Sequence, residues 1–149
     1  MGLPRAEGGM DMLSDRLARL PKPIRSRIRA VGKQSRDEVA ALRAQHGVTL
    51  VASRYENFGG TLIEAMAAGS AVVCTRVGGL QEIATDEETA LLVPPEDPRA
   101  MAEACLRLMG DHNMARRLGK AARRHVADCY APEAIARRMA DFLTRVLRA

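Results

Sequence analysis

Residues 48–75 read VTLVASRYENFGGTLIEAMAAGSAVVCT and decide the fold. Two continuous β-prone runs, 48–52 and 71–75, are typical of strands that are buried on both faces of a sheet. Between them, the helical spacing of apolar residues predicts a helix over about 61–68 that ends at Gly69. A strand, a helix and a second strand in this order predict two parallel strands joined by a right-handed crossover.

Upstream of this unit, the pattern is weaker. Residues 1–27 carry no sustained periodicity and are expected to form a lead-in of undetermined structure. A short apolar run predicts a strand at 28–32, and Ser35 with Glu38 forms a capping box that opens a helix.

Downstream, a turn at 78–79, a short helix at 80–84 and a fourth strand at 90–93 continue the alternation. From there on the pattern is wholly helical, and capping residues or proline mark three helix starts: Asp97, Asp111 and Pro132. The last helix carries Ile135, Met139, Phe142 and Val146 at helical spacing. Five methionines occupy core-like helical positions: Met66, Met101, Met109, Met114 and Met139.

The fold class expected is therefore α/β, a partial Rossmann-like parallel sheet of three to four strands followed by C-terminal helices, within a domain at 28–149. A chain of 149 residues, 47% of them hydrophobic, buries enough surface to need no disulfide or metal. The three cysteines, Cys74, Cys105 and Cys129, are widely spaced and favour a reduced, cytoplasmic protein. No segment resembles a signal peptide or a membrane span.

The net charge of +5 is unevenly distributed. Residues 1–47 and 111–149 each carry +5, whereas 48–110 carries −5. Two Tyr, two Phe and no Trp offer few stacking platforms, so we expect no nucleic-acid partner. One helical surface is basic and is interpreted as a solvated face; it consists of Arg116, Lys120, Arg123 and Arg124. The alternative is a peripheral contact of this surface with the inner face of an anionic membrane.

The loop after the 48–52 strand holds the best candidate for a binding site. In an open parallel sheet, ligands bind beyond the carboxyl ends of strands, at loops that lead into helices. Gly59 and Gly60 let the backbone approach a ligand, and the start of the following helix favours a phosphate. Glu56 and Glu64 can face the same pocket and accept hydrogen bonds from hydroxyls of a ribose and a sugar, which indicates a nucleotide-sugar pocket.

Both glutamates also have explanations that need no ligand. Thr61 and Glu64 have the spacing of a capping box, and Glu56 is then simply a loop carboxylate.

His125 and Cys129 are one helical turn apart, but with no further ligands they are interpreted as core or boundary residues, not a metal site.

Residues 53–69 and 71–82, with 91–94 and Asp97, resemble the donor-binding half of the retaining GT-B glycosyltransferases of family 4, the glycosyl transferases group 1. The hallmark is two glutamates separated by seven residues, here Glu56 and Glu64. The resemblance covers about 28–148 and consists of several linked motifs in the right order.

By this resemblance, the chain is a hexosyltransferase-like enzyme that transfers a sugar from a nucleoside diphosphate sugar with retention. Glu64 would bind the ribose hydroxyls and Glu56, as the catalytic candidate, would lie against the transferred sugar. The remaining donor-binding candidates would cradle the sugar and the distal phosphate through backbone N–H groups: Phe58, Gly59, Gly60 and Thr61. The donor is a substrate, and no cofactor or metal is implied.

The chain also departs from the family. It is short for the domain, as if truncated, and the expected partner is an acceptor-binding domain on another chain. The two strands that carry the family's diphosphate-binding Arg and Lys are not found, and Arg25, Arg27 and Lys33 are not assigned those roles. The alternatives are a non-catalytic nucleotide-sugar-binding or interaction remnant, and a basic protein that binds anions on nucleic acid or membrane.

Overall fold

The computed structural model describes residues 8–148, and the chain divides into two compact units, Met1–Arg36 and Asp37–Ala149. The described part of the first unit contains α1 (Gly8–Ala18) and the one-turn helix α2 (Lys22–Arg25), which Pro21 caps. The strand expected at 28–32 does not form, so this prediction was wrong. Ile28 and Val31 are exposed, and no strand among the described residues pairs with this stretch.

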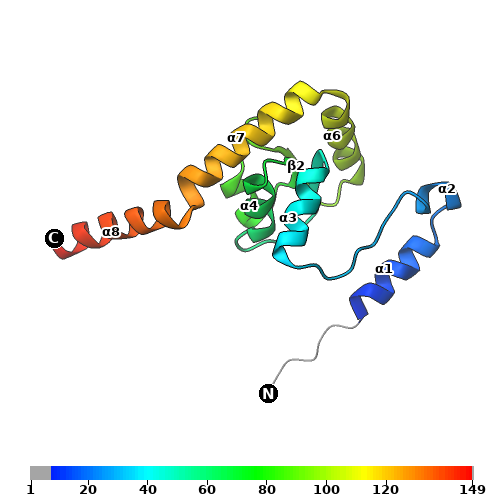
Figure 1. Cartoon of the computed structure of the whole chain (residues 1–149), viewed down its shortest axis with the longest axis horizontal. Coiled ribbons are helices and arrows are strands. Elements are labelled where there is room, and N and C mark those ends of the chain that lie inside the picture. Colours follow the sequence, from blue (N-terminus) through cyan, green and yellow to red (C-terminus); the bar gives the residue numbers. More distant parts are fainter. Residues whose placement is uncertain (1–7, 149) are drawn as a thin grey trace, which may run out of the picture. The chain divides into compact units, whose positions relative to one another are not determined.

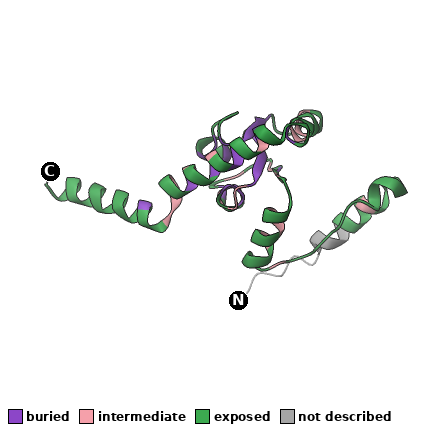
Figure 2. Cartoon of the chain, turned by 45° about the horizontal axis from the view of Figure 1, so that its top comes forward, coloured by how far each residue is buried: buried purple, intermediate pink, exposed green. Residues whose placement is uncertain are grey.

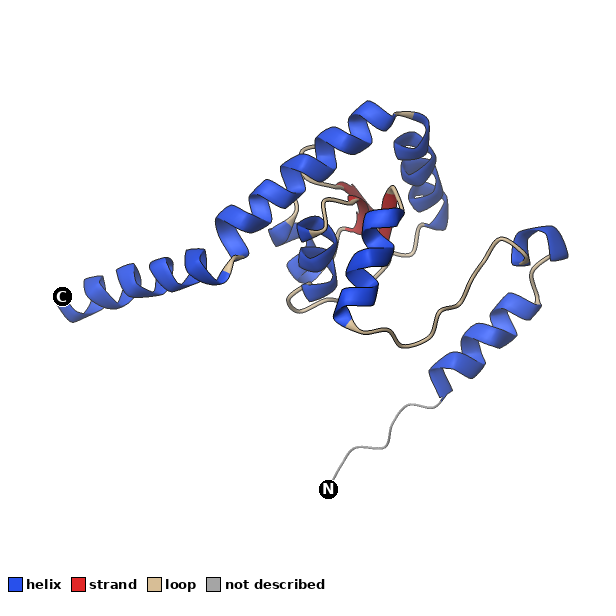
Figure 3. Cartoon of the chain, in the orientation of Figure 1, coloured by secondary structure: helices blue, strands red, loops and turns tan. Residues whose placement is uncertain are grey.

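The second unit is built around a parallel sheet with the strand order β1-β2-β3 (Figures 1 and 3). The helix α3 (Arg36–Gln45) leads into β1 (Val48–Val51), which pairs in register with β2 (Ala71–Thr75). The strand β2 pairs in turn with β3 (Leu91–Val93). The predicted α/β class with a parallel sheet is confirmed, with three strands among the described residues.

Two helices follow the carboxyl ends of the first two strands. The helix α4 (Gly60–Ala67) connects β1 to β2, and α5 (Gly78–Ile83) comes directly after β2. The prediction for α4 is confirmed to within one residue. The turn expected at 78–79 is in fact the first turn of α5, which starts two residues earlier than predicted.

The core has one layer on each face of the sheet. Side chains alternate along β2, so that Val72 and Cys74 pack toward α4 and α5, whereas Ala71 and Val73 pack toward α6 (Pro98–Gly110). The helix α7 (His112–Tyr130) contributes to both layers, because its first half packs beside α6 and its second half beside α4. All five residues of β2 are buried, as its continuous apolar run predicts.

The predicted helix starts after the sheet are confirmed. The Asp97 carboxylate accepts a hydrogen bond from the N–H of Ala100, 2.9 Å away, and begins α6. The Asp111 carboxylate accepts from the N–H groups of Asn113 and Met114 and begins α7. The last helix, α8 (Pro132–Arg148), starts at Pro132 as expected.

The apolar stripe of α8 does not lie in the core, so the core position predicted for Met139 was wrong. Ala134 is its only buried residue in the described part, and Figure 2 shows the rest of the helix mostly exposed. Met109 on α6 is exposed as well. Helical spacing identifies an apolar face correctly, but it does not say whether another element covers that face.

None of the described helices is both long enough and apolar enough to cross a membrane.

Candidate functional site

The loop between β1 and α4 lies at the carboxyl ends of β1 and β2 and is fixed at two points. The Thr75 hydroxyl donates a hydrogen bond to the carbonyl of Ser53 at 2.6 Å, next to the end of β1. The N–H of Gly79 donates to the carbonyl of Glu56 at 3.0 Å. A Cβ on Gly78 would lie 2.0 Å from that same carbonyl oxygen, so only glycine permits this close approach.

The start of α4 offers backbone donors that the helix itself does not pair. Gly59 caps the helix with a φ of 97°, a left-handed conformation that favours glycine, and its carbonyl accepts from the N–H groups of Leu62 and Ile63. The N–H groups of Gly60 and Thr61 belong to the first turn, where a helix has no backbone acceptor of its own. A Cβ at Gly60 would meet nothing within 4 Å, so the space beside this residue is open.

Glu56 belongs to the same loop and contacts its backbone. Its Oε1 atom accepts a hydrogen bond from the N–H of Gly59 at 3.2 Å. The carboxylate is therefore held beside the start of α4, directly next to the predicted phosphate-binding turn. The structure thus brings together Glu56, Phe58, Gly59, Gly60 and Thr61, as residues of one loop and one first helical turn.

Glu64 lies one helical turn further along α4 and is bound by a residue that the sequence did not single out. Arg43 of α3 donates from Nη1 to Glu64 Oε2 at 3.0 Å and from Nη2 to the Thr61 carbonyl at 3.4 Å. The Arg43 side chain is 12% exposed, and that of Glu64 is 52% exposed. The partner of Glu64 is therefore an arginine of another helix.

The capping box considered for Thr61 and Glu64 is not formed. The cap of α4 is Gly59, no side chain caps this helix, and Thr61 lies within it. Sequence reasoning missed Arg43, although a signal was present. Arg43 lies four residues after Val39 and next to Leu42, and all three are partly buried on the packed face of α3. A charged residue on a packed helical face needs a partner.

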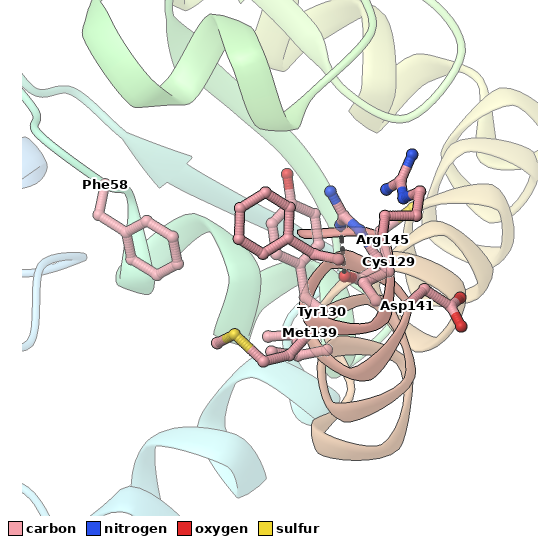
Figure 4. Close-up of a pocket in the computed structure, with 9 residues that line it drawn as sticks. Phe58, Cys129, Tyr130, Met139, Asp141 and Arg145 are labelled. Atoms are coloured by element: carbon pink, nitrogen blue, oxygen red, sulfur yellow. Dashed lines mark hydrogen bonds between the residues drawn. The ribbon is translucent and has the colours of Figure 1, made fainter. Parts of the chain in front are cut away.

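An open pocket of about 530 Å³ adjoins the loop at Phe58. Figure 4 shows Phe58 on one side and the side chains of the end of α7 and of α8 on the other, with Tyr130 and Met139 among them. Arg138 donates to the carbonyl of Cys129 at 3.5 Å within this pocket. Burial raises the pKa of the Tyr130 hydroxyl.

A second cavity, of about 400 Å³, lies at the opposite ends of the strands and is basic. It is lined by the ends of α3 and α4 and the start of α7, with four cationic or titratable side chains: Arg43, His46, His112 and Arg116. Arg43 reaches both this cavity and Glu64.

The remaining residues that the sequence singled out are placed as follows. Cys129 Sγ lies 3.9 Å from His125 Nδ1, and the described residues contain no group of three or more potential metal ligands. The His125 ring packs edge-on against Tyr130 at 5.8 Å. Arg116, Lys120, Arg123 and Arg124 are all exposed on α7.

The chain resembles known proteins both in sequence and in fold. Residues 17–125 match the family model described as glycosyl transferases group 1. A curated relative, N-acetyl-alpha-D-glucosaminyl L-malate synthase of Bacillus anthracis, is 34% identical over 125 residues, which are 84% of this chain and 32% of the relative. The chain therefore spans about a third of the length of this relative.

Solved structures share the fold. The C-terminal domain of a glycosyl transferase group 1 family protein from Francisella tularensis has a TM-score of 0.66 at 22% identity, over 86% of this chain and 65% of that one. The Anabaena protein HepE, solved in complex with UDP-glucose, has a TM-score of 0.81 at 21% identity, over 93% of this chain and 38% of that one. The sheet and its helices thus match a GT-B C-terminal domain.

Proposed function

The chain belongs to the glycosyl transferases group 1, and from this we propose that it forms the donor-binding part of a retaining glycosyltransferase. Its ligand would be a nucleoside diphosphate sugar, from which a sugar is transferred to an acceptor. The observation that carries the proposal is the first turn of α4, where the helix leaves the N–H groups of Gly60 and Thr61 without a backbone acceptor, the space beside Gly60 is open, and a glutamate lies on either side.

The proposed roles follow from the chemistry of these groups. The N–H groups of Phe58, Gly60 and Thr61 and the positive end of α4 would bind the sugar and the distal phosphate, while the N–H of Gly59 holds Glu56 beside them. During transfer, negative charge develops on the departing diphosphate, and fixed backbone donors stabilise such charge without having to reorganise. This role needs no side chain at Gly59 or Gly60, which agrees with the open space in front of Gly60.

The two glutamates would act as hydrogen-bond acceptors. A carboxylate beside a phosphate repels it, so its favourable partners are hydroxyl groups. We assign Glu64 to the ribose hydroxyls and Glu56 to the transferred sugar. The hydrogen bond of Glu56 to Gly59 N–H supports this, because it fixes the carboxylate next to the turn that would hold the phosphate.

The acceptor would be bound by residues outside these 149, on another domain or another chain. The length of the curated relative, about three times that of its matched part, supports this division. The proposal for these 149 residues is therefore limited to binding of the sugar donor.

Titration calorimetry with UDP-glucose and other nucleotide sugars tests the proposal, since the related fold of HepE was solved with UDP-glucose. We expect saturable binding by the wild type and a loss of about tenfold or more in affinity for Glu64→Ala, because hydrogen bonds to charged groups contribute about 1.5–3 kcal/mol. Glu103→Ala is the matched control, since Glu103 is an exposed glutamate on α6. Equal binding by the wild type and Glu64→Ala contradicts the proposed pocket.

A further inference from the structure

We propose that Arg43 is a positioning residue that fixes the Glu64 carboxylate for the ribose of the nucleotide. The inference rests on the proposed function, and it concerns a residue on a different helix from every donor-binding candidate. Three observations carry it: the double contact of the guanidinium, the difference in exposure between the two side chains, and the attachment of Arg43 to the α4–β2 connection.

The guanidinium of Arg43 contacts two points of one helix. Nη1 donates to Glu64 Oε2 at 3.0 Å, while Nη2 donates to the carbonyl of Thr61 at 3.4 Å. The planar guanidinium contacts both the Glu64 carboxylate and the backbone of the same helix. It therefore fixes the direction in which the Glu64 side chain points as well as the distance between the two side chains. A lysine has a single ammonium group and does not reproduce this two-point contact.

The backbone of Arg43 is itself anchored. The buried Ser70, which follows α4, donates from its hydroxyl to the carbonyl of Arg43 at 3.3 Å. Arg43 therefore joins α3 to both ends of α4, and its nearly covered side chain has little freedom to move. Glu64 is half exposed, so its carboxylate remains open to a ligand from the solvent side.

The contact leaves Glu64 able to bind a ligand. A carboxylate has about four lone-pair sites on its two oxygens, and the contact with Arg43 is made by Oε2. The carboxylate can thus accept from Arg43 and from a ribose hydroxyl at the same time. The positive charge of Arg43 also offsets the charge of Glu64, which otherwise repels a diphosphate at the start of the same helix.

The test measures how strongly the chain distinguishes UDP from 2′-deoxy-UDP, because this ratio reports the hydrogen bond to the ribose and not overall folding. Calorimetric affinities for both nucleotides are determined for the wild type, Arg43→Met, Arg43→Lys, Glu64→Gln and the double variant Arg43→Met/Glu64→Gln. Arg99→Met is the control, since it breaks an exposed arginine–glutamate pair on α6. Thermal unfolding shows that each variant is folded.

For the wild type and Arg99→Met we expect UDP to bind about tenfold more tightly than 2′-deoxy-UDP. Arg43→Met lowers this ratio by about threefold or more, and Arg43→Lys restores it only in part. The double variant loses no more discrimination than Glu64→Gln alone, because Arg43 acts through Glu64.

The outcomes separate the inference from the function on which it rests. If Glu64→Gln lowers the ratio but Arg43→Met and Arg43→Lys leave it at the wild-type value, the inference is wrong and the proposed function stands. If the wild type binds neither nucleotide, or Glu64→Gln leaves the ratio unchanged, the assignment of Glu64 to the ribose is overturned, and the role of Arg43 with it.

Discussion

Arg43 Nη1 lies 3.0 Å from Glu64 Oε2, and this contact joins α3 to α4 across 21 positions of the chain. The pair is unequal, since the arginine is nearly covered and the glutamate is half exposed. An arginine held in this way has a limited effect on stability, because water screens the exposed partner.

Arg43→Met is accordingly expected to lower the free energy of unfolding by only about 1 kcal/mol. Urea unfolding followed by circular dichroism measures it. Arg99→Met, in an exposed pair, should change it less. A loss of several kcal/mol for Arg43→Met would mean that the arginine holds the fold together and is not mainly a positioning residue.

The contact between α7 and the turn after α4 gives a second prediction. A Cβ at Gly119 would lie 2.2 Å from the carbonyl oxygen of Gly69, which is backbone and cannot rotate away. Gly119→Ala should therefore destabilise the protein by about 1–3 kcal/mol, although alanine favours a helix. Its control is Gly110→Ala, where a Cβ meets nothing within 4 Å and a neutral or slightly stabilising effect is expected. Chemical denaturation of both variants checks this, and equal midpoints would contradict the close packing.

The cap of α7 gives a third prediction. The Asp111 carboxylate accepts from the N–H groups of Asn113 and Met114 at 3.0 and 2.9 Å, so Asp111→Ala leaves both donors without this acceptor. We expect a loss of about 1 kcal/mol in thermal or urea unfolding. Asp128→Ala, which removes an exposed aspartate 3.7 Å from Arg124, should leave the unfolding midpoint close to that of the wild type.

How far the sequence predicts this structure depends on whether a feature is local. The buried strand β2 and the caps at Asp97 and Asp111 are set by adjacent residues and were predicted correctly. The predictions of a strand at 28–32 and of a core position for Met139 on α8 were wrong, because each requires a partner element that is distant in the sequence. A pattern shows that a face is apolar, but only the fold shows what covers it.

The candidate site shows the same division. The loop and the first turn of α4 could be located, because glycines and a helix start are local signals. The contact between Arg43 and Glu64 could not be predicted, because the two residues are 21 positions apart and the helical pattern around Arg43 does not indicate that α3 packs against α4. The close approach of Gly78 to Glu56 likewise requires knowledge of how two loops meet.

Alkaline pH provides a fourth prediction. Burial in the core, with a smaller effect of Asp86, raises the pKa of the Cys74 thiol from 9.0 to about 12. The unfolded chain therefore releases this proton at a lower pH than the folded chain does. The contribution of Cys74 to stability is fully present below pH 9 and is lost as the pH rises toward 12.

The free energy of unfolding should thus fall more steeply between pH 9 and 12 in the wild type than in Cys74→Ala. Other groups that titrate in this range are common to both proteins, so the difference between the two curves isolates Cys74. Parallel curves would show that the thiol titrates normally in the folded state.

The most direct test of the central claim is a titration of the ¹⁵N-labelled chain with UDP, followed through its backbone amide resonances. The account predicts saturable shifts that are largest at Gly59, Gly60 and Thr61 and are much reduced in Glu64→Ala, because a diphosphate would bind at the open first turn of α4. Shifts centred instead on the basic cavity at His46 and Arg116, or no saturable shift at all, would contradict it.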